Sequence, residues 1–160
     1  MNLEFNIAIH VLTFLTKHKD EKFNSKELAE LTCLNPVQLR RVVSVLSDQH
    51  YITTVRGKGG GYQSNQHTAS VNLATLYQQF VLNKESKHRI YTGDTSSHCD
   101  ISKHIAHTMS DYYDEEIQLI LNFYRNKTIQ DVLNDILQEV NKSWQLMTLS
   151  SLDLEKQVKL

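Results

Sequence analysis

The sequence predicts a mainly α-helical chain with one small two-stranded β-sheet, and three observations support this fold class. Apolar residues recur at helical spacing in the N-terminal part of the chain and again beyond residue 100. Asn35 followed by Pro36 is a strong signal for the start of a helix. Four of the five glycines fall in the stretch ValArgGlyLysGlyGlyGlyTyr at 55–62, where a short hairpin can turn.

Length and composition limit the class of protein. At 160 residues the chain can form one modest domain, or a small domain with an arm. Its two cysteines are too few for a disulfide scaffold. The N-terminal residues do not resemble a signal peptide, and no apolar run approaches the roughly 18 residues of a membrane span. We therefore expect a cytoplasmic protein with reduced thiols and no membrane partner.

The formal net charge of −1 is unevenly distributed along the chain. Residues 34–62 carry four basic side chains and a single acidic one, Asp48. Residues 100–139 carry eight acidic side chains and three basic ones. One end of the molecule should therefore attract phosphates, and the other end should repel them.

Two helices are expected in the N-terminal part. The first spans about residues 3–19 and has an amphipathic pattern. Its apolar face consists of Phe5, Ile7, Ala8, Val11, Leu12 and Leu15. Asn24 stands three residues before Glu27, which is the spacing of a capping box, and it begins a short second helix around Leu28.

A third helix is expected from Pro36 to about Gln49. Asn35 is suited to the N-cap, and Pro36 fits the first helical position because its missing N–H costs nothing there. The face that this helix buries is expected to consist of Leu39, Val42, Val43 and Leu46. Two short helices joined by a tight turn and followed by a hairpin predict a winged helix-turn-helix domain.

The glycine-rich stretch requires an explanation of its own. A phosphate-binding loop needs Gly-Lys-Ser/Thr followed by a helix, and neither feature occurs after Gly61. The tip of a wing is favoured, because glycines permit a sharp turn and a close approach to a phosphate or the minor groove. The expected wing residues are Gly57, Gly59, Gly60, Gly61 and Tyr62, with Arg56 and Lys58 as positive charges. An ordinary flexible hairpin remains the alternative.

On these residues the sequence resembles the bacterial winged-helix regulators typified by IscR, NsrR and CymR. The resemblance is carried by LysGluLeuAlaGlu at 26–30, LeuAsnProValGlnLeu at 34–39 and the wing stretch at 55–62. The wing is the most specific part, because members commonly carry Val-Arg-Gly-x-x-Gly-Gly-Tyr there. The overall plan is similar to about residue 140, including a helix near 73–82, a variable loop and a long helix.

The resemblance implies homodimers that bind an imperfect palindrome in double-stranded DNA. It places the third helix in the major groove and the wing in the minor groove. It implies that the recognition helix contacts DNA through Asn35, Gln38, Arg40 and Arg41, and the wing through Arg56 and Lys58. Members similar to IscR have an acid followed by glutamine where this chain has two arginines. We therefore expect a different operator, since arginine favours guanine edges or phosphates.

The sequence beyond residue 100 indicates a dimerisation region. An apolar stripe recurs every three or four residues over about six turns, which suits a partner helix, with packing inside one chain as the alternative. The stripe consists of Ile105, Met109, Tyr112, Tyr113, Ile117, Ile120 and Tyr124. Thr128 stands three residues before Asp131 and is expected to cap a last helix. The residues expected to face inward from that helix are Ile129, Val132, Leu133, Ile136 and Leu137.

The predicted organisation therefore has four parts. Residues 1–82 form the winged helix-turn-helix DNA-binding domain, and residues 83–100 form a sensor loop. Residues 101–141 form the dimerisation helices, and residues 142–160 form a C-terminal tail. The tail is expected either to extend the last helix across a partner or to fray.

The cysteines suggest what such a regulator senses. Members that hold an iron–sulfur cluster carry three closely spaced cysteines before the long helix, whereas this chain has only Cys99 there. We therefore expect no cofactor. Cys33 lies in the turn before the recognition helix, near its positive N-terminal end and near Arg40 and Arg41, where thiolates are favoured. Cys99 lies in a polar loop.

The two thiols predict a redox switch. Oxidation of Cys33 or Cys99 to a sulfenic acid would be followed by disulfide formation, within one chain or across the dimer. In this respect the chain is most similar to oxidant-sensing regulators of the HypR type. The resemblance thus implies a repressor of oxidative or electrophile stress genes. Two ordinary packing cysteines are the alternative.

The sequence also bears on three other functions. His98, Cys99, Asp100, His104 and His107 lie close in sequence, so a metal sensor is an alternative, although a single thiolate and the absence of a standard spacing disfavour it. A small-molecule pocket at the dimer interface, near Tyr112 and Tyr113, is another. The usual hydrolase motifs do not occur in the sequence, so we expect that the protein is not an enzyme.

Overall fold

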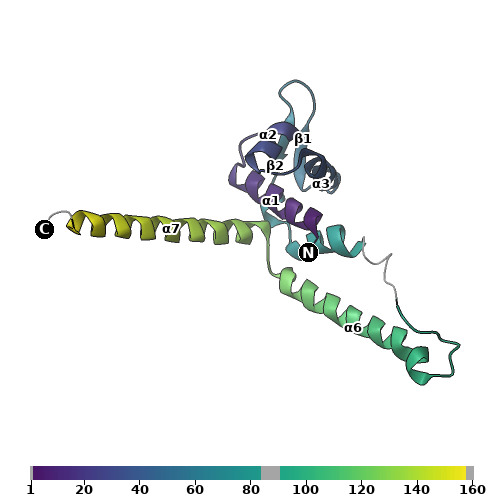
Figure 1. The fold of residues 1–160 in the computed structure, drawn as a ribbon. Coiled ribbons are helices and arrows are strands. Elements are labelled where there is room, and N and C mark those ends of the chain that lie inside the picture. Colours follow the sequence, from purple (N-terminus) through teal and green to yellow (C-terminus); the bar gives the residue numbers. More distant parts are fainter. Residues whose placement is uncertain (1, 84–90, 158–160) are drawn as a thin grey trace.

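The computed structural model describes residues 2–83 and 91–157. Residues 84–90 of the predicted sensor loop and residues 158–160 of the predicted tail lie outside the described residues. The described part is mainly α-helical with one two-stranded sheet, as the sequence predicts. The elements between Leu3 and Leu82 lie together and are called the head. Two long helices extend from the head in different directions (Figure 1). No helix in these two ranges is long and apolar enough to cross a membrane.

The head contains the predicted helix-turn-helix and wing. Its elements in chain order are α1 (Leu3–Lys17), α2 (Ser25–Leu31), α3 (Pro36–Asp48), β1 (Ile52–Val55), β2 (Gly61–Ser64), the 3₁₀ turn η1 (Thr68–Ser70), α4 (Leu73–Tyr77) and the π turn η2 (Gln78–Leu82). The first helix ends at Lys17 and the third at Asp48, slightly earlier than predicted. The helix expected near residues 73–82 is present as α4 and η2.

Asparagine side chains begin the helices of the head. Asn24 Oδ1 accepts hydrogen bonds from the N–H groups of Lys26 and Glu27 at 2.9 and 3.0 Å. The Glu27 carboxylate accepts one from the Asn24 N–H at 2.8 Å, which confirms the predicted capping box. Asn35 caps α3 and Pro36 occupies its first turn, again as predicted.

Helix α1 lies at the centre of the head. All six of its predicted core residues are buried, and the helix packs against α3, α4, β2 and α7. The four predicted core residues of α3 are all fully buried as well. Burying an aliphatic or aromatic side chain contributes roughly 1.5–3 kcal/mol. The head is therefore organised around one continuous apolar cluster.

The wing is attached to the head through its second strand. Strands β1 and β2 are antiparallel and pair Val55 with Gly61 and Thr54 with Tyr62. On its other edge, β2 meets Phe23, which precedes the N-cap Asn24 of α2. The Tyr62 N–H donates to the Phe23 carbonyl at 2.8 Å, and the Phe23 N–H donates to the Tyr62 carbonyl at 3.0 Å. The base of the wing is thus fixed to the helix-turn-helix.

The two long helices, α6 (Asp100–Arg125) and α7 (Ile129–Gln157), meet at the head. The Leu73 N–H donates to the Lys127 carbonyl at 2.9 Å, and the Ile129 N–H donates to the Val71 carbonyl at 3.0 Å. Ile129 is fully buried in the apolar cluster of the head. The connection between α6 and α7 is therefore part of the head rather than a free linker.

The predicted cap of the last helix is present at this junction. Thr128 donates hydrogen bonds to one carboxylate oxygen of Asp131 from its backbone N–H at 2.8 Å and from its hydroxyl at 2.7 Å. These bonds, the side-chain one foremost, lower the pKa of Asp131 below its usual value. The helix starts at Ile129 because its first turn is held in this way.

Two predictions about the long helices were wrong in detail. Tyr124 was expected to face a partner helix, but its ring packs against Phe5 and Tyr77 of its own head, with ring centres 5.5 and 5.6 Å apart. Ile136 and Leu137 were expected to face inward, but they are 48% and 40% exposed, because α7 has already left the head at that point (Figure 1). Of the two possibilities for the tail, the structure extends the helix, to Gln157.

We expect Gly61→Ala to destabilise the head. A Cβ at this position would lie 2.6 Å from the Phe23 carbonyl oxygen, so the pairing of β2 with Phe23 must shift. Overpacking of this kind costs about 1–3 kcal/mol, measurable by urea unfolding at fixed protein concentration. The control is Gly59→Ala, whose Cβ meets nothing within 4 Å. That variant bears only the strain of its positive φ, about 1–2 kcal/mol. A Gly61→Ala protein as stable as the wild type would contradict this account.

Candidate nucleic-acid interface

Helix α3 has one fully buried face, and its opposite, outer face is exposed. At 3.6 residues per turn, Val37, Arg41 and Ser44 lie on the side that points away from the core, and all three are exposed. Val37 and Arg41 are four residues apart, so they are neighbours on one ridge of the helix. The centre of the exposed face thus combines an apolar and a cationic side chain.

Arg40 lies on a different side of α3, towards the wing. The hydroxyl oxygens of Ser47 in α3 and Thr54 in β1 are 2.7 Å apart, and this hydrogen bond marks the wing side of the helix. Arg40 precedes Ser47 by two helical turns and therefore shares this side. Its Nε donates to the Pro36 carbonyl at 3.2 Å. The two adjacent arginines consequently point to different surroundings.

Asn35 and Gln38 also lie at the start of α3, but they differ in what they can contact. Asn35 Oδ1 accepts hydrogen bonds from the N–H groups of Val37 at 2.9 Å and Gln38 at 3.3 Å. Its oxygen is therefore used for capping, and only its amide N–H₂ is left to donate. The side chain of Gln38 is exposed.

The wing presents Arg56 and Lys58 on a short glycine turn. Both residues are exposed. The Gly60 N–H donates a hydrogen bond to the Gly57 carbonyl at 3.0 Å, and this bond closes the turn from Gly57 to Gly60. Gly57 and Gly59 have φ values of 99° and 79°, which side-chain-bearing residues rarely adopt. The glycines therefore shape the tip of the wing, which projects from the head (Figure 1), and the two exposed cations belong to this tip.

Gly61 and Tyr62 serve the fold rather than the exposed tip. Gly61 lies too close to the Phe23 backbone to accept a side chain. Tyr62 is half-buried, pairs with Phe23 and packs against the apolar cluster of the head. The sequence alone predicts that all four glycines permit the sharp turn of the wing and a close approach to a ligand. It does not reveal the role of Gly61 in the fold, because the crowding partner of Gly61, Phe23, lies far away along the chain.

The four cations are available for a ligand. Within the part of the chain that the structure describes, Arg40, Arg41, Arg56 and Lys58 form no salt bridge with a carboxylate. They occur on α3 and on the tip of the wing beside it, two elements joined by the Ser47–Thr54 hydrogen bond. Four cations against the single exposed acid Asp48 leave an excess of positive charge on two adjoining elements, which suits a polyanion such as nucleic acid.

Sequence reasoning missed Val37 in this face. Its side chain is 58% exposed, although valine is usually buried. The signal was present in the sequence, because Val37 falls outside the repeat that marks the buried face of α3. Ser47 was also missed, since its role depends on Thr54 in the wing.

The two cysteines lie in different parts of the molecule. Cys33 is exposed in the turn between α2 and α3 and has a φ of 55°, a conformation rare for residues other than glycine. Cys99 is exposed at the N-cap of α6, where its N–H donates to Ser97 Oγ at 3.1 Å. In Figure 1 this end of α6 is the one remote from the head. One chain therefore does not bring the two thiols together.

The histidines near Cys99 are not arranged as a metal site. His107 Nδ1 lies 3.2 Å from a carboxylate oxygen of Asp111 on the same exposed helix. Among the residues that the structure describes, no three His, Cys, Asp or Glu side chains are grouped so that they could hold a metal ion. The residues of the sequence cluster are thus spread out, with His98 and Cys99 just before α6 and Asp100, His104 and His107 in its first turns.

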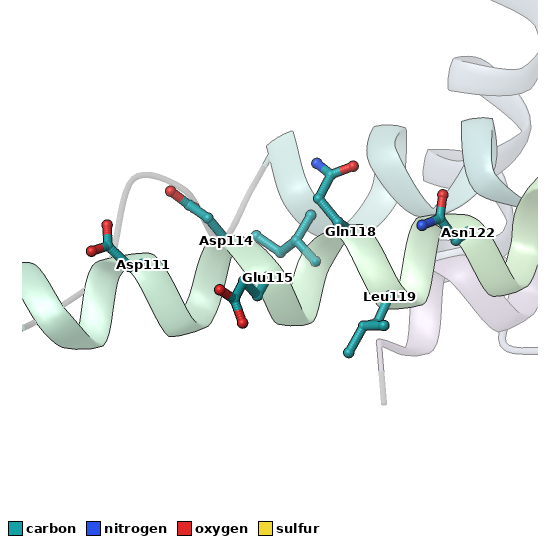
Figure 2. A pocket seen from close by; sticks show the side chains of 7 residues that line it. Asp111, Asp114, Glu115, Gln118, Leu119 and Asn122 are labelled. Atoms are coloured by element: carbon teal, nitrogen blue, oxygen red, sulfur yellow. The ribbon is translucent and has the colours of Figure 1, made fainter.

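A hollow follows the middle of α6. It is lined by Asp111, Asp114, Glu115, Ile117, Gln118, Leu119 and Asn122. Figure 2 shows Asp114 and Gln118 on one side of the helix and Leu119 on the other. Because its lining includes three carboxylates, the hollow is acidic, in contrast to the basic α3 and wing.

Comparison with known proteins places this arrangement in a family. The model of the Rrf2 family, described as iron-dependent transcriptional regulators, matches residues 1–135. YwnA of Bacillus subtilis (strain 168), assigned as an HTH-type transcriptional regulator, is 24% identical over 136 residues, which are 85% of this chain and 98% of YwnA. The transcriptional regulator NsrR of Oceanobacillus iheyensis is 32% identical over 82 residues, 49% of this chain and 56% of NsrR.

Iron dependence does not fit the side chains of this chain. Iron–sulfur clusters are held by several cysteine thiolates, and this sequence has two cysteines in all, which lie on separate elements. The described residues also contain no other grouped donor set for a metal ion. The cysteines and the described donor side chains of this chain therefore do not fit an iron–sulfur cluster.

Solved structures have the same fold. A protein from Lactobacillus plantarum, assigned as a transcriptional regulator, is 32% identical with a TM-score of 0.75, covering 89% of this chain and 99% of that one. IscR from T. potens is 17% identical with a TM-score of 0.60, covering 85% and 87%. CymR from Staphylococcus aureus is 16% identical with a TM-score of 0.57, covering 81% and 94%.

These matches confirm the winged-helix fold and the expectation of a regulator rather than an enzyme. With the family model covering residues 1–135, the chain belongs to the Rrf2 family of transcriptional regulators.

Proposed function

We propose that the protein is a homodimeric repressor that binds an imperfect palindrome in double-stranded DNA and responds to oxidants through Cys33 and Cys99. The observation that carries the DNA-binding part is the pairing of the exposed face of α3 with the cationic tip of the wing. A helix of this kind fits the major groove, and a basic wing fits the adjoining minor groove or its phosphates. The acidic α6 keeps the opposite part of the molecule away from DNA.

The two arginines of α3 have different proposed roles. Arg41 lies at the centre of the exposed face, where a guanidinium can bind the O6 and N7 of a guanine. Arg40 lies towards the wing, where it would meet the phosphates that separate the two grooves. Asn35 acts mainly by fixing the start of α3, and its free N–H₂ group, together with Gln38, completes the contact surface.

This division of roles predicts unequal effects of two neighbouring substitutions. Arg41→Ala is expected to cost about 1–3 kcal/mol and to relax base preference at one position of each half-site. Arg40→Ala is expected to weaken binding to all sequences and to lower the salt slope of log K by about one for each protomer. Fluorescence anisotropy titrations with an operator and a scrambled duplex at several salt concentrations measure both. Identical base preference and salt slope in the two variants would contradict the assignment.

The dimer is proposed from α6. Although this helix is 26 residues long, none of its residues is buried in the single chain. Ile101, Tyr112, Leu119 and Phe123 are 76%, 60%, 71% and 64% exposed, and their spacing places them on one face. An apolar stripe of this length is covered in stable proteins by another helix. This exposed stripe is rotated about the axis of α6 relative to the stripe predicted from the sequence, because Tyr124 of the predicted stripe packs against the head.

A charge in the stripe should separate the protomers. Leu119→Asp is expected to convert the dimer to a monomer in sedimentation velocity runs, because a carboxylate would be buried without a partner. Gln118→Asp is the matched control, since it adds the same charge outside the stripe and should leave the dimer intact. A Leu119→Asp protein that remains dimeric at micromolar concentration would rule out this interface.

The redox switch is proposed from the exposure and placement of the two thiols. A peroxide oxidises one thiolate to a sulfenic acid and is itself reduced, and the second thiol then displaces water to form a disulfide. The bond needs Cα atoms within about 7 Å. Because Cys33 and Cys99 are separated within one chain, Cys33 would pair with Cys99 of the partner subunit. Such a bond would tie a DNA-reading turn to the dimerisation helix and alter the head spacing that a palindrome requires.

Non-reducing gel electrophoresis and intact mass before and after a stoichiometric pulse of hydrogen peroxide test the switch. We expect a covalent dimer in the wild type that reverses with thiol, and none in Cys33→Ser or Cys99→Ser. Cys33→Gly is a further control, because glycine removes the thiol and suits the positive φ at this position. A chain of unchanged mass, or normal oxidant-dependent DNA binding in the double serine variant, would refute the switch.

The acidic hollow on α6 favours a second candidate signal. A second copy packed on the stripe would cover Leu119 and leave the carboxylates of the hollow at the edge of the contact, which suits a cationic small molecule beside the dimer interface. This candidate replaces the thiol switch if oxidants leave the protein unchanged. Isothermal titration calorimetry with aliphatic polyamines as probes measures binding to this hollow directly, and an Asp114→Asn variant is titrated for comparison.

A further inference from the structure

Val37 is exposed at a position where neither packing nor helix formation explains it. It is the second residue of α3, and 58% of its surface is accessible. Valine has a lower helix propensity than unbranched residues, and the first turn of a helix favours acidic or polar side chains. An exposed valine here therefore contributes little to the stability of the head. Departures of this kind from local preference tend to occur where a surface meets a ligand.

The surroundings of Val37 identify that ligand. Recognition helices contact base edges through their N-terminal residues. Val37 lies one turn before Arg41 on the same ridge, so their Cβ atoms are about 5–6 Å apart. Successive base pairs are about 3.4 Å apart. Two side chains with this separation reach bases that are one or two steps apart in the major groove.

The chemistry of the groove then decides the base. Of the groups exposed in the major groove, the 5-methyl of thymine is the only methyl group, and the edges of the other bases present mainly hydrogen-bond donors and acceptors. Valine has no polar group with which to replace the water on those donors and acceptors, so covering them costs free energy. Val37 can therefore favour thymine by contact and disfavour other bases by desolvation.

We propose that Val37 is a specificity-determining residue that contacts the 5-methyl group of a thymine within two base pairs of the base that Arg41 contacts. This inference rests on the proposed DNA binding and adds a base identity to it. Removal of one buried methyl group from such a contact costs about fourfold in affinity per half-site. For a dimer with two equal half-sites the loss is about sixteenfold.

The test uses the full-length protein and synthetic duplexes. Selection from a randomised 30-base-pair library, with the wild-type protein, supplies the operator. Each thymine near the position sensitive to Arg41→Ala is then replaced by deoxyuridine, which lacks only the methyl group. The affinity ratio of thymine to deoxyuridine duplexes is measured for the wild type, Val37→Thr and Val37→Ser. In the wild type we expect one thymine per half-site at which the affinity ratio of thymine to deoxyuridine is about fourfold. We expect a smaller ratio for Val37→Thr and a ratio near one for Val37→Ser.

Arg40→Ala is the matched control, because it should weaken binding while preserving the thymine ratio. A ratio near one at every thymine in the wild type, a ratio that persists in Val37→Ser, or an operator without thymine in this interval would each overturn the inference while leaving DNA binding intact. Failure of the library to yield any bound duplex at low salt would instead refute the proposed function, and the inference with it.

Discussion

Phe5, Ala8, Val11 and Leu12 lie on one face of α1, and this face is packed on several sides at once. Helix α3, the base of the wing, α4 and the first turn of α7 all meet it. Their positions relative to one another are therefore set by a shared apolar contact rather than by the turns that join them. The exposed face of α3 and the cationic wing have a fixed geometry because α1 holds the elements from which they project. Binding to a rigid duplex favours such preorganisation, since little entropy is lost on contact.

Local signals in the sequence predicted the elements of the head well. Asn24 with Glu27 and Asn35 with Pro36 act within one helical turn, so nearby residues suffice to determine where α2 and α3 begin. The exposed and buried faces of α3 also follow from its repeat. The arginines were correctly expected on that helix, but their different sides became visible only through the contact of Ser47 with Thr54.

Features that depend on distant contacts were not predicted. The outward face of α6 differs from the apolar repeat in the sequence because Tyr124 packs on Phe5 and Tyr77, which come from other elements. The requirement for Gly61 comes from Phe23, and no pattern near the wing reveals it. Val37 is a different case, because the repeat of α3 already places it on the exposed face, but its apolar side chain is of a type that is usually buried.

The buried position of Ile129 and the hydrogen bonds of Leu73 and Ile129 join α6 to the head without a flexible linker. A helix of 26 residues is about 39 Å long, so α6 acts as a lever with the head at one end and Cys99 at the other. Tilting such a lever by about 5° moves the head by about 3.4 Å, the rise of one base pair. In the proposed dimer, a change too small to disturb the packing at the remote end of α6 would therefore put the two heads out of phase with their half-sites.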